Sequence, residues 1–328
     1  MANWRAAPVS DAHVFLMVLL MERIPLIDPA PGSERNMHCI AATKDVCGEG
    51  AVWHPEESAI YWTDINRRLL HRYQLSNSDV ATWQFDQPVT AVVLTEDPEQ
   101  LLIVLGGSVI FWNTKSYRSS APIFQLSSWP VTRCNDARVG PDGALWFGTM
   151  QNNVRSDGSE IAITQNLGEL LCLDVSGRTQ VWQTGIGIAN TVVWSTSGDR
   201  LFFGDTLRNC IYVSAFDISL SSISQPVTFT QGFSRGLPDG SAMDSQGYLW
   251  NCRYGGGCIV RFAPDGSVAE VIETPVKNPT TCAFGGLDLK TLYITSAIAP
   301  DTQEGEIGGA LFEMQVDVAG LPSNRFRL

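Results

Sequence analysis

The chain has 328 residues, of which 44% are hydrophobic and 17% are charged, and it contains 29 Gly and 17 Pro. This composition excludes a disordered or fibrous chain and suits many short strands joined by tight turns. The formal net charge of −12 would repel phosphate backbones and anionic lipid headgroups, so we expect neither nucleic acid nor a membrane surface as a partner.

The first 36 residues show none of the strand pattern that begins near Cys39. Their one apolar run, residues 14–21, is too short to span a bilayer and has no convincing cleavage site after it. We therefore expect two parts: a poorly ordered extension over residues 1–36, and one folded domain over residues 37–328.

Eight cysteines are scattered through hydrophobic segments, without the CxxC spacing of a zinc site or the density of a disulfide scaffold. This distribution is typical of buried free thiols, and it predicts a reducing, cytoplasmic location. Nothing in the sequence indicates an oligomeric state.

Six short β-type runs recur along the domain, each after a turn-rich stretch such as the Pro-Asp-Gly of residues 141–143. In chain order they are residues 59–63, 101–105, 144–148, 200–204, 248–252 and 291–295. Repeats of four strands that pack only on their neighbours are typical of propeller blades. The sequence therefore predicts an all-β, six-bladed β-propeller with a central channel, and a long loop over one face at residues 151–167.

When the six repeats are aligned, one residue of each repeat occupies the same position. This residue lies at the start of the strand that precedes the β-type run. These residues lie 41 to 55 positions apart and are Glu49, Thr90, Asn135, Asn190, Asp239 and Thr280. The innermost strands of a propeller line its channel, so equivalent residues form a ring around the axis. Four of the six carry carboxylate or amide oxygens, the donors that Ca²⁺, Mg²⁺, Mn²⁺ and, less exclusively, Zn²⁺ accept. We expect one divalent cation here, of unspecified identity, although each residue alone could be an ordinary turn residue.

Five segments carry a resemblance to a known family, and they occur in that family's order. They are residues 48–55 (GEGAVWHP), 133–136 (RCND) with 141–150 (PDGALWFGTM), 187–190 (GIAN), 236–240 (GLPDG) and 279–286 (PTTCAFGG). Together they resemble the signatures of the regucalcin (senescence marker protein) and gluconolactonase family of metal-dependent sugar lactonases.

The resemblance implies roles for individual residues. It implies that Glu49, Asn190 and Asp239 bind the metal, and that Arg133 and Asn135 contact substrate. Asp136 is assigned to the substrate group as well, although it could instead brace the loop. The implied activity is hydrolysis of a small sugar lactone to the aldonic acid. The cation would polarise the lactone carbonyl, and Asp239 would act as general base and catalytic residue.

Two other function classes remain open at this stage. One is a propeller hydrolase acting on phosphotriesters or aryl esters through the same cation. The other is a calcium-binding regulatory protein or interaction platform without turnover. A nucleophilic Ser–His–Asp hydrolase is not supported, because none of the four histidines lies at a ring position and no Gly-x-Ser-x-Gly elbow occurs.

Overall fold

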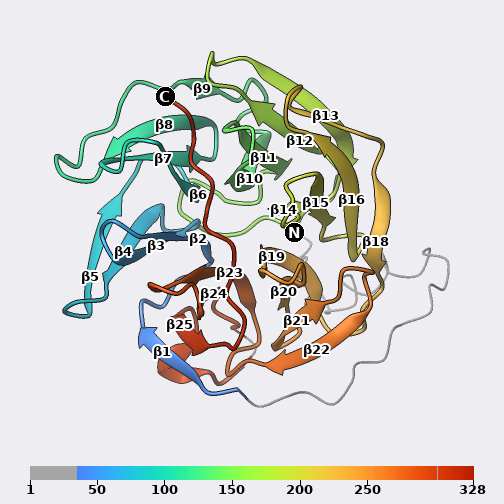
Figure 1. Ribbon diagram of the computed structural model, residues 1–328. Helices are drawn as coiled ribbons and strands as arrows, with labels where there is room; N and C mark the ends of the chain where they lie inside the picture. Colours follow the sequence, from blue (N-terminus) through green and yellow to red (C-terminus); the bar gives the residue numbers. More distant parts are fainter. Residues whose placement is uncertain (1–34, 301) are drawn as a thin grey trace, which may run out of the picture.

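Six antiparallel sheets surround a central axis in the computed structural model, which describes residues 35–300 and 302–328 (Figure 1). The predicted six-bladed β-propeller is confirmed. The expected extension, residues 1–36, lies almost entirely outside the described residues.

In the first five blades each strand after the first pairs with the one before it in the chain, apart from the last strand of the fourth blade. The inner strands are β2 (Gly48–His54), β6 (Val89–Leu94), β10 (Thr132–Val139), β14 (Ala189–Trp194), β19 (Leu237–Met243) and β23 (Pro279–Gly285). The second strands, which contain nearly all of the six repeated runs, are β3 (Ala59–Asp64), β7 (Gln100–Leu105), β11 (Leu145–Gln151), β15 (Arg200–Asp205), β20 (Leu249–Tyr254) and β24 (Thr291–Ser296).

The third strands are β4 (Leu69–Gln74), β8 (Ser108–Asn113), β12 (Gly168–Leu173), β16 (Cys210–Asp217), β21 (Cys258–Phe262) and β25 (Leu311–Gln315). The outer strands are β5 (Asp79–Gln84), β9 (Phe124–Gln125), β13 (Thr179–Ile186), β17 (Ser222–Ile223) with β18 (Val227–Gln231), β22 (Val268–Glu273) and β1 (Met37–Ala41). A short 3-10 helix, η1 (Gly305–Ile307), precedes β25. No helix within the described part of the chain could cross a membrane.

Both ends of the described chain contribute to the last blade. Strand β1 pairs with β25 as the outermost strand of the sheet β23–β24–β25–β1. Between this blade and the first, Trp53 stacks on Tyr293 at 5.9 Å, in a cluster that also buries Trp62. Five similar apolar clusters join the other neighbouring blades. The ring is therefore held by blade-to-blade packing.

The last ten residues, 319–328, cross one end of the channel (Figure 1). We call them the C-terminal strap. The strap leaves the fifth blade at the Asp244–Gly320 bridge and reaches the second blade at the Thr95–Phe326 bridge. Phe326 is 3% exposed and packs in the cluster between the second and third blades. The strap thus connects opposite sides of the ring.

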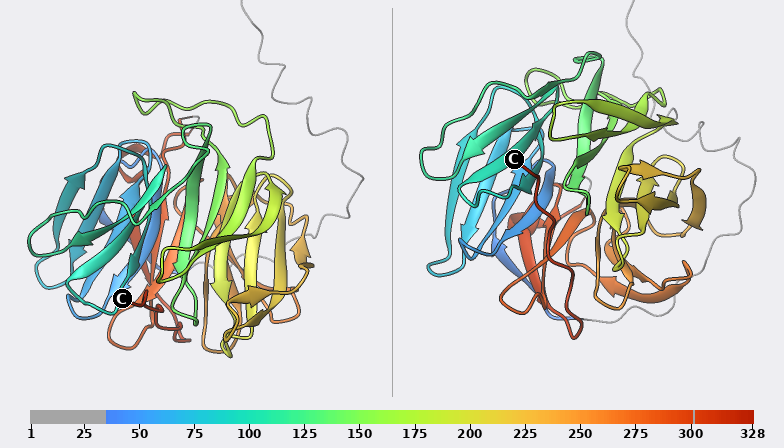
Figure 2. Two further views of the ribbon diagram at one scale, coloured as in Figure 1. Left: turned by 90° about the horizontal axis from the view of Figure 1, so that it is seen from above. Right: turned by 45° about the horizontal axis from the view of Figure 1, so that its top comes forward.

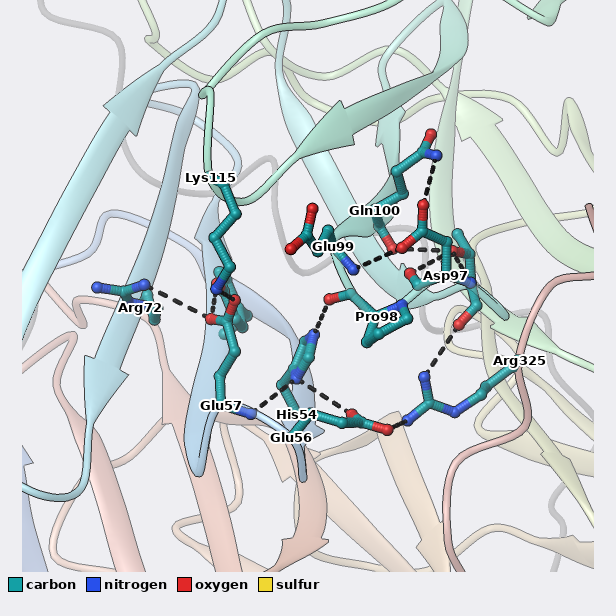
Figure 3. Close-up of polar contacts among 12 residues, drawn as sticks. His54, Glu56, Glu57, Arg72, Asp97, Pro98, Glu99, Gln100, Lys115 and Arg325 are labelled. Atoms are coloured by element: carbon teal, nitrogen blue, oxygen red, sulfur yellow. Dashed lines mark hydrogen bonds and ion pairs between the residues drawn. The ribbon is translucent and has the colours of Figure 1, made fainter.

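A junction of turns fixes the strap at the edge of the first blade (Figure 3). Arg325 bonds to the carboxylate of Glu56, and its Nη1 donates to Thr95 O at 3.0 Å. His54 sits beside this pair with Nε2 2.9 Å from Pro98 O, while its Nδ1 accepts from the Glu57 N–H at 3.3 Å. Burial lowers the pKa of His54, so the ring is neutral and acts as a structural link. It lies at the opposite end of β2 from Glu49.

All eight cysteines are free, and six of them are buried. This agrees with the prediction from their spacing.

Candidate metal and substrate site

A β-bulge occurs at the ring residue of every inner strand. The pairing register shifts between Glu49 and Val52 in β2, between Asn190 and Val193 in β14, and at the corresponding places in the other four blades. A bulge leaves residues unpaired and re-aims their side chains. The six ring residues therefore share one local backbone feature, at the start of each inner strand.

Two glycines follow ring residues because the bulges bring neighbouring inner strands very close. Gly50 has φ of +60°, and a Cβ there would lie 2.9 Å from Ala91 Cα. A Cβ on Gly240 would lie 2.0 Å from Thr281 Oγ1. Any side chain at either position would push two blades apart. The glycines of the GEG and PDG segments thus have a packing role beside the predicted ligands.

A chain of hydrogen bonds connects predicted site residues of three blades. Arg133 Nη1 donates to Asn135 Oδ1 at 2.6 Å, and Asn135 Nδ2 donates to Asn190 Oδ1 at 2.9 Å. Asn190 Nδ2 then donates to Asp239 Oδ1 at 2.7 Å. All four side chains are less than 8% exposed. Residues separated by up to 106 positions therefore form one continuous polar layer across the channel.

Glu49 completes this layer from the first blade. Burial raises the pKa of Glu49 to about 8, with a further contribution from the negative charge of Asp136. Burial and the charge of Glu49 likewise raise the pKa of Asp239 well above its ordinary value. Two buried carboxylates whose pKa values are both raised are stabilised in their charged form when a cation lies between them.

The donor set fits a hard divalent cation. Glu49 and Asp239 offer anionic oxygens, and Asn190 Oδ1 keeps a free lone pair while it accepts from Asn135. In the described residues no group of three or more His, Cys, Asp or Glu side chains is placed to hold a metal. The predicted set differs from such a group because its third donor is an amide.

Metal binding should stabilise the protein more strongly as the pH rises. A carboxyl group with a raised pKa binds its proton more tightly in the folded state, so its contribution to stability is present at low pH and is lost as pH rises toward about 8. A cation replaces that proton only when the proton leaves. We expect the increase in melting temperature on adding Ca²⁺ to be larger at about pH 9 than at about pH 6. Calorimetry with Mg²⁺, Mn²⁺ and Zn²⁺ in parallel checks this, and an increase that is equal at both pH values would contradict it.

Asp136 lies just behind the polar layer. It is 6% exposed, and its Oδ2 accepts from the Val192 N–H at 3.2 Å. It therefore braces the neighbouring inner strand β14. The two threonines of the ring bond to backbone carbonyls instead of site residues: Thr90 to Val104 O at 3.3 Å, and Thr280 to Gly48 O.

The long loop predicted at residues 151–167 lies over the same face as the polar layer. It connects β11 to β12 and rises above the rim (Figure 2, left). Asn66 of the first blade donates to Gly158 O at 3.0 Å, and Arg133 Nε donates to Asn153 Oδ1 at 2.9 Å. Asn153 is a site residue that sequence reasoning missed, because nothing in the loop repeats between blades.

Comparison with known proteins identifies the family. Residues 47–298 match the family model described as SMP-30/Gluconolactonase/LRE-like region. The chain belongs to this family. The resemblance stated from the five segments is therefore confirmed.

Other members of the SMP-30/gluconolactonase family align over most of their length. Pentonolactonase XacC of Haloferax volcanii is 33% identical over 292 residues, which are 85% of this chain and 94% of the relative. L-arabinolactonase of Azospirillum brasilense is 30% identical over 300 residues, 88% and 94% of the two chains. Among solved structures, a calcium-binding protein named regucalcin from Agrobacterium tumefaciens superimposes with a TM-score of 0.84 at 25% identity, over 91% of this chain and 100% of that one.

Proposed function

We propose that the protein hydrolyses a sugar lactone to the aldonic acid with the help of one divalent cation held by Glu49, Asn190 and Asp239. The observation that carries this proposal is the single buried layer in which an arginine, two amides and two carboxylates from four blades face the channel. The relatives named pentonolactonase and L-arabinolactonase support the substrate class.

The chemistry divides between the cation and the side chains. A divalent cation bound here would supply an electrophile that polarises the lactone carbonyl. Asp239 takes the proton of the water that attacks the carbonyl carbon, and it returns this proton to the ring oxygen as the acyl C–O bond breaks and the ring opens. Arg133 donates a hydrogen bond to a sugar hydroxyl oxygen, and Asn135 Oδ1 accepts one from a sugar hydroxyl, since its Nδ2 already donates to Ala189 O and Asn190 Oδ1. These two bonds hold the sugar ring in place. Asn153 keeps the Arg133 guanidinium oriented from the loop above.

Removing the Arg133 guanidinium should weaken substrate binding more than the chemical step. In Arg133→Ala we expect KM to rise roughly tenfold or more, because a charge-assisted hydrogen bond to the sugar is lost. Initial rates of proton release over a panel of five- and six-carbon aldonolactones measure this. Arg155→Ala, which removes an exposed arginine of the long loop at residues 151–167, is the matched control and should leave KM unchanged. A fall in kcat with unchanged KM would contradict the assignment of Arg133 to substrate.

Chelation tests the whole proposal. Turnover should vanish with a chelator and return with one of the four cations named above. The second candidate, calcium binding without turnover, is favoured by the structural likeness to the calcium-binding regucalcin. Cation binding with no hydrolysis of any lactone would select that candidate. Hydrolysis of aryl esters or phosphotriesters, but of no lactone, would select the esterase alternative. The free thiols further support a cytoplasmic location within this proposal.

A further inference from the structure

A cavity lies in the half of the channel away from the predicted metal. It has a volume of about 320 Å³ and is bordered by the inner strands of all six blades and by residues 321–324 of the C-terminal strap. Its lining includes the exposed Thr196 and Ser197, so it reaches the surface. This volume lies at the lower end of the range for small-molecule pockets.

Arg138 separates this cavity from the polar layer. It lies on β10 in the third blade, and its Nη2 donates to Ser241 O at 3.1 Å and to Cys282 O at 3.2 Å, in the fifth and sixth blades. The guanidinium therefore spans the channel. At the equivalent position the other five blades carry Val52, Val93, Val193, Ala242 and Ala283.

The guanidinium of Arg138 has donors to spare. Its Nε and Nη1 make no hydrogen bond with the described residues, and it has no carboxylate partner within ion-pair distance. Arg138 is half-buried and lines the cavity, so these nitrogens can donate to a ligand there. The cavity therefore favours a ligand that brings acceptor oxygens.

The remaining lining limits the ligand to one small, singly charged molecule. Val139, Met243, Phe284 and Leu321 present apolar surface to the cavity, which suits a short alkyl chain. The Asp136 carboxylate at the inner end disfavours a second negative charge on the ligand. A carboxylate is the planar acceptor that a guanidinium binds best.

We propose that the far half of the channel is a second binding site, for a short-chain monocarboxylate whose carboxylate bonds to Arg138 beneath the C-terminal strap. Figure 2, left, shows the long loop and the C-terminus at opposite faces of the ring, and the cavity is bordered by the C-terminal strap. The proposed site is therefore separate from the proposed lactone site. The net charge of −12 opposes anion binding at long range, but physiological salt screens such charges beyond about 8 Å.

Isothermal titration of the full-length protein with butyrate tests this proposal, with a chelator present so that carboxylates cannot bind through a cation. We expect saturable one-to-one binding of butyrate and none of butyramide, which has the same shape without the charge. In Arg138→Gln the affinity should fall roughly tenfold or more, because a charge-assisted bond is lost. Arg133→Ala should leave the isotherm unchanged, since Arg133 faces the other half of the channel.

Ala242→Met supplies a second test that does not change any charge. Ala242 lines the cavity, so the longer side chain should fill it and abolish butyrate binding. Circular dichroism melting establishes that each variant folds, and if Arg138→Gln does not fold, Ala242→Met decides. The proposal is overturned by absence of butyrate binding to the unmodified protein. It is equally overturned by butyrate affinity that survives in both cavity variants, or by binding that is lost in Arg133→Ala alone.

Discussion

Asp239→Asn should reduce lactone hydrolysis by roughly 10³-fold and weaken cation binding at the same time. The amide is isosteric, so the hydrogen bond from Asn190 Nδ2 has an acceptor in either case. What disappears is the negative charge and the ability to accept a proton. Single-turnover rates with saturating cation separate the loss of the base from the loss of the metal.

Two further variants are compared with Asp239→Asn: one control and one that should share its loss of cation affinity. Asp199→Asn changes an exposed carboxylate in the fourth blade that contacts only the nearby Ser195, Ser197 and Arg200, and it should leave the rate unchanged. Glu49→Gln should lose cation affinity as Asp239→Asn does, because the two carboxylates share one buried layer. Full activity in Asp239→Asn would show that the site assignment is wrong.

Phe326→Ala should lower the free energy of unfolding by about 3 kcal/mol, the usual cost of removing a buried Phe side chain. Phe326 is 3% exposed, and its ring lies 6.2 Å from that of Phe111 in an edge contact. Phe326 also anchors the C-terminal strap, because its backbone N–H donates to Leu94 O at 2.9 Å. Urea denaturation followed by tryptophan fluorescence measures the loss.

Leu328→Ala is the matched control in the same segment. Leu328 is 60% exposed, so its truncation should change stability by less than about 0.5 kcal/mol. In Phe326→Ala the folded fraction should keep its kcat, because the strap lies on the face opposite the polar layer. A loss of stability below about 1 kcal/mol would mean that the strap is held mainly by its polar bonds.

The repeat made the fold and the candidate ligands predictable. Once the six strands were in register, Glu49, Asn190 and Asp239 had to lie at equivalent places around one axis, and equivalent places in a propeller are close together. The resemblance to the family then distinguished Asn190 from Asn135, which the register alone treats alike.

Features that do not repeat could not be found in this way. The C-terminal strap has no counterpart in the other blades, and its contacts join residues such as Arg325 and Glu56 that are 269 positions apart. The bulge at each ring residue is visible in sequence only as Gly50 and Gly240, whereas Thr191 adopts φ of +57° at the equivalent place without any such signal. Arg138 occupies a position where the other blades have Val or Ala, but its reach across the channel depends on the shape of the ring.

The pairing of β1 with β25 has a consequence for synthesis of the chain on the ribosome. The sixth sheet takes its outer strand from residues 37–41 and its third strand from residues 311–315, so β1 must wait, unpaired, until nearly all of the protein has been translated. During that time the nascent chain exposes an unpaired strand and an incomplete sheet edge, both of which invite pairing with other chains. Truncation at either end would make that exposure permanent, and aggregation of the product is the expected result.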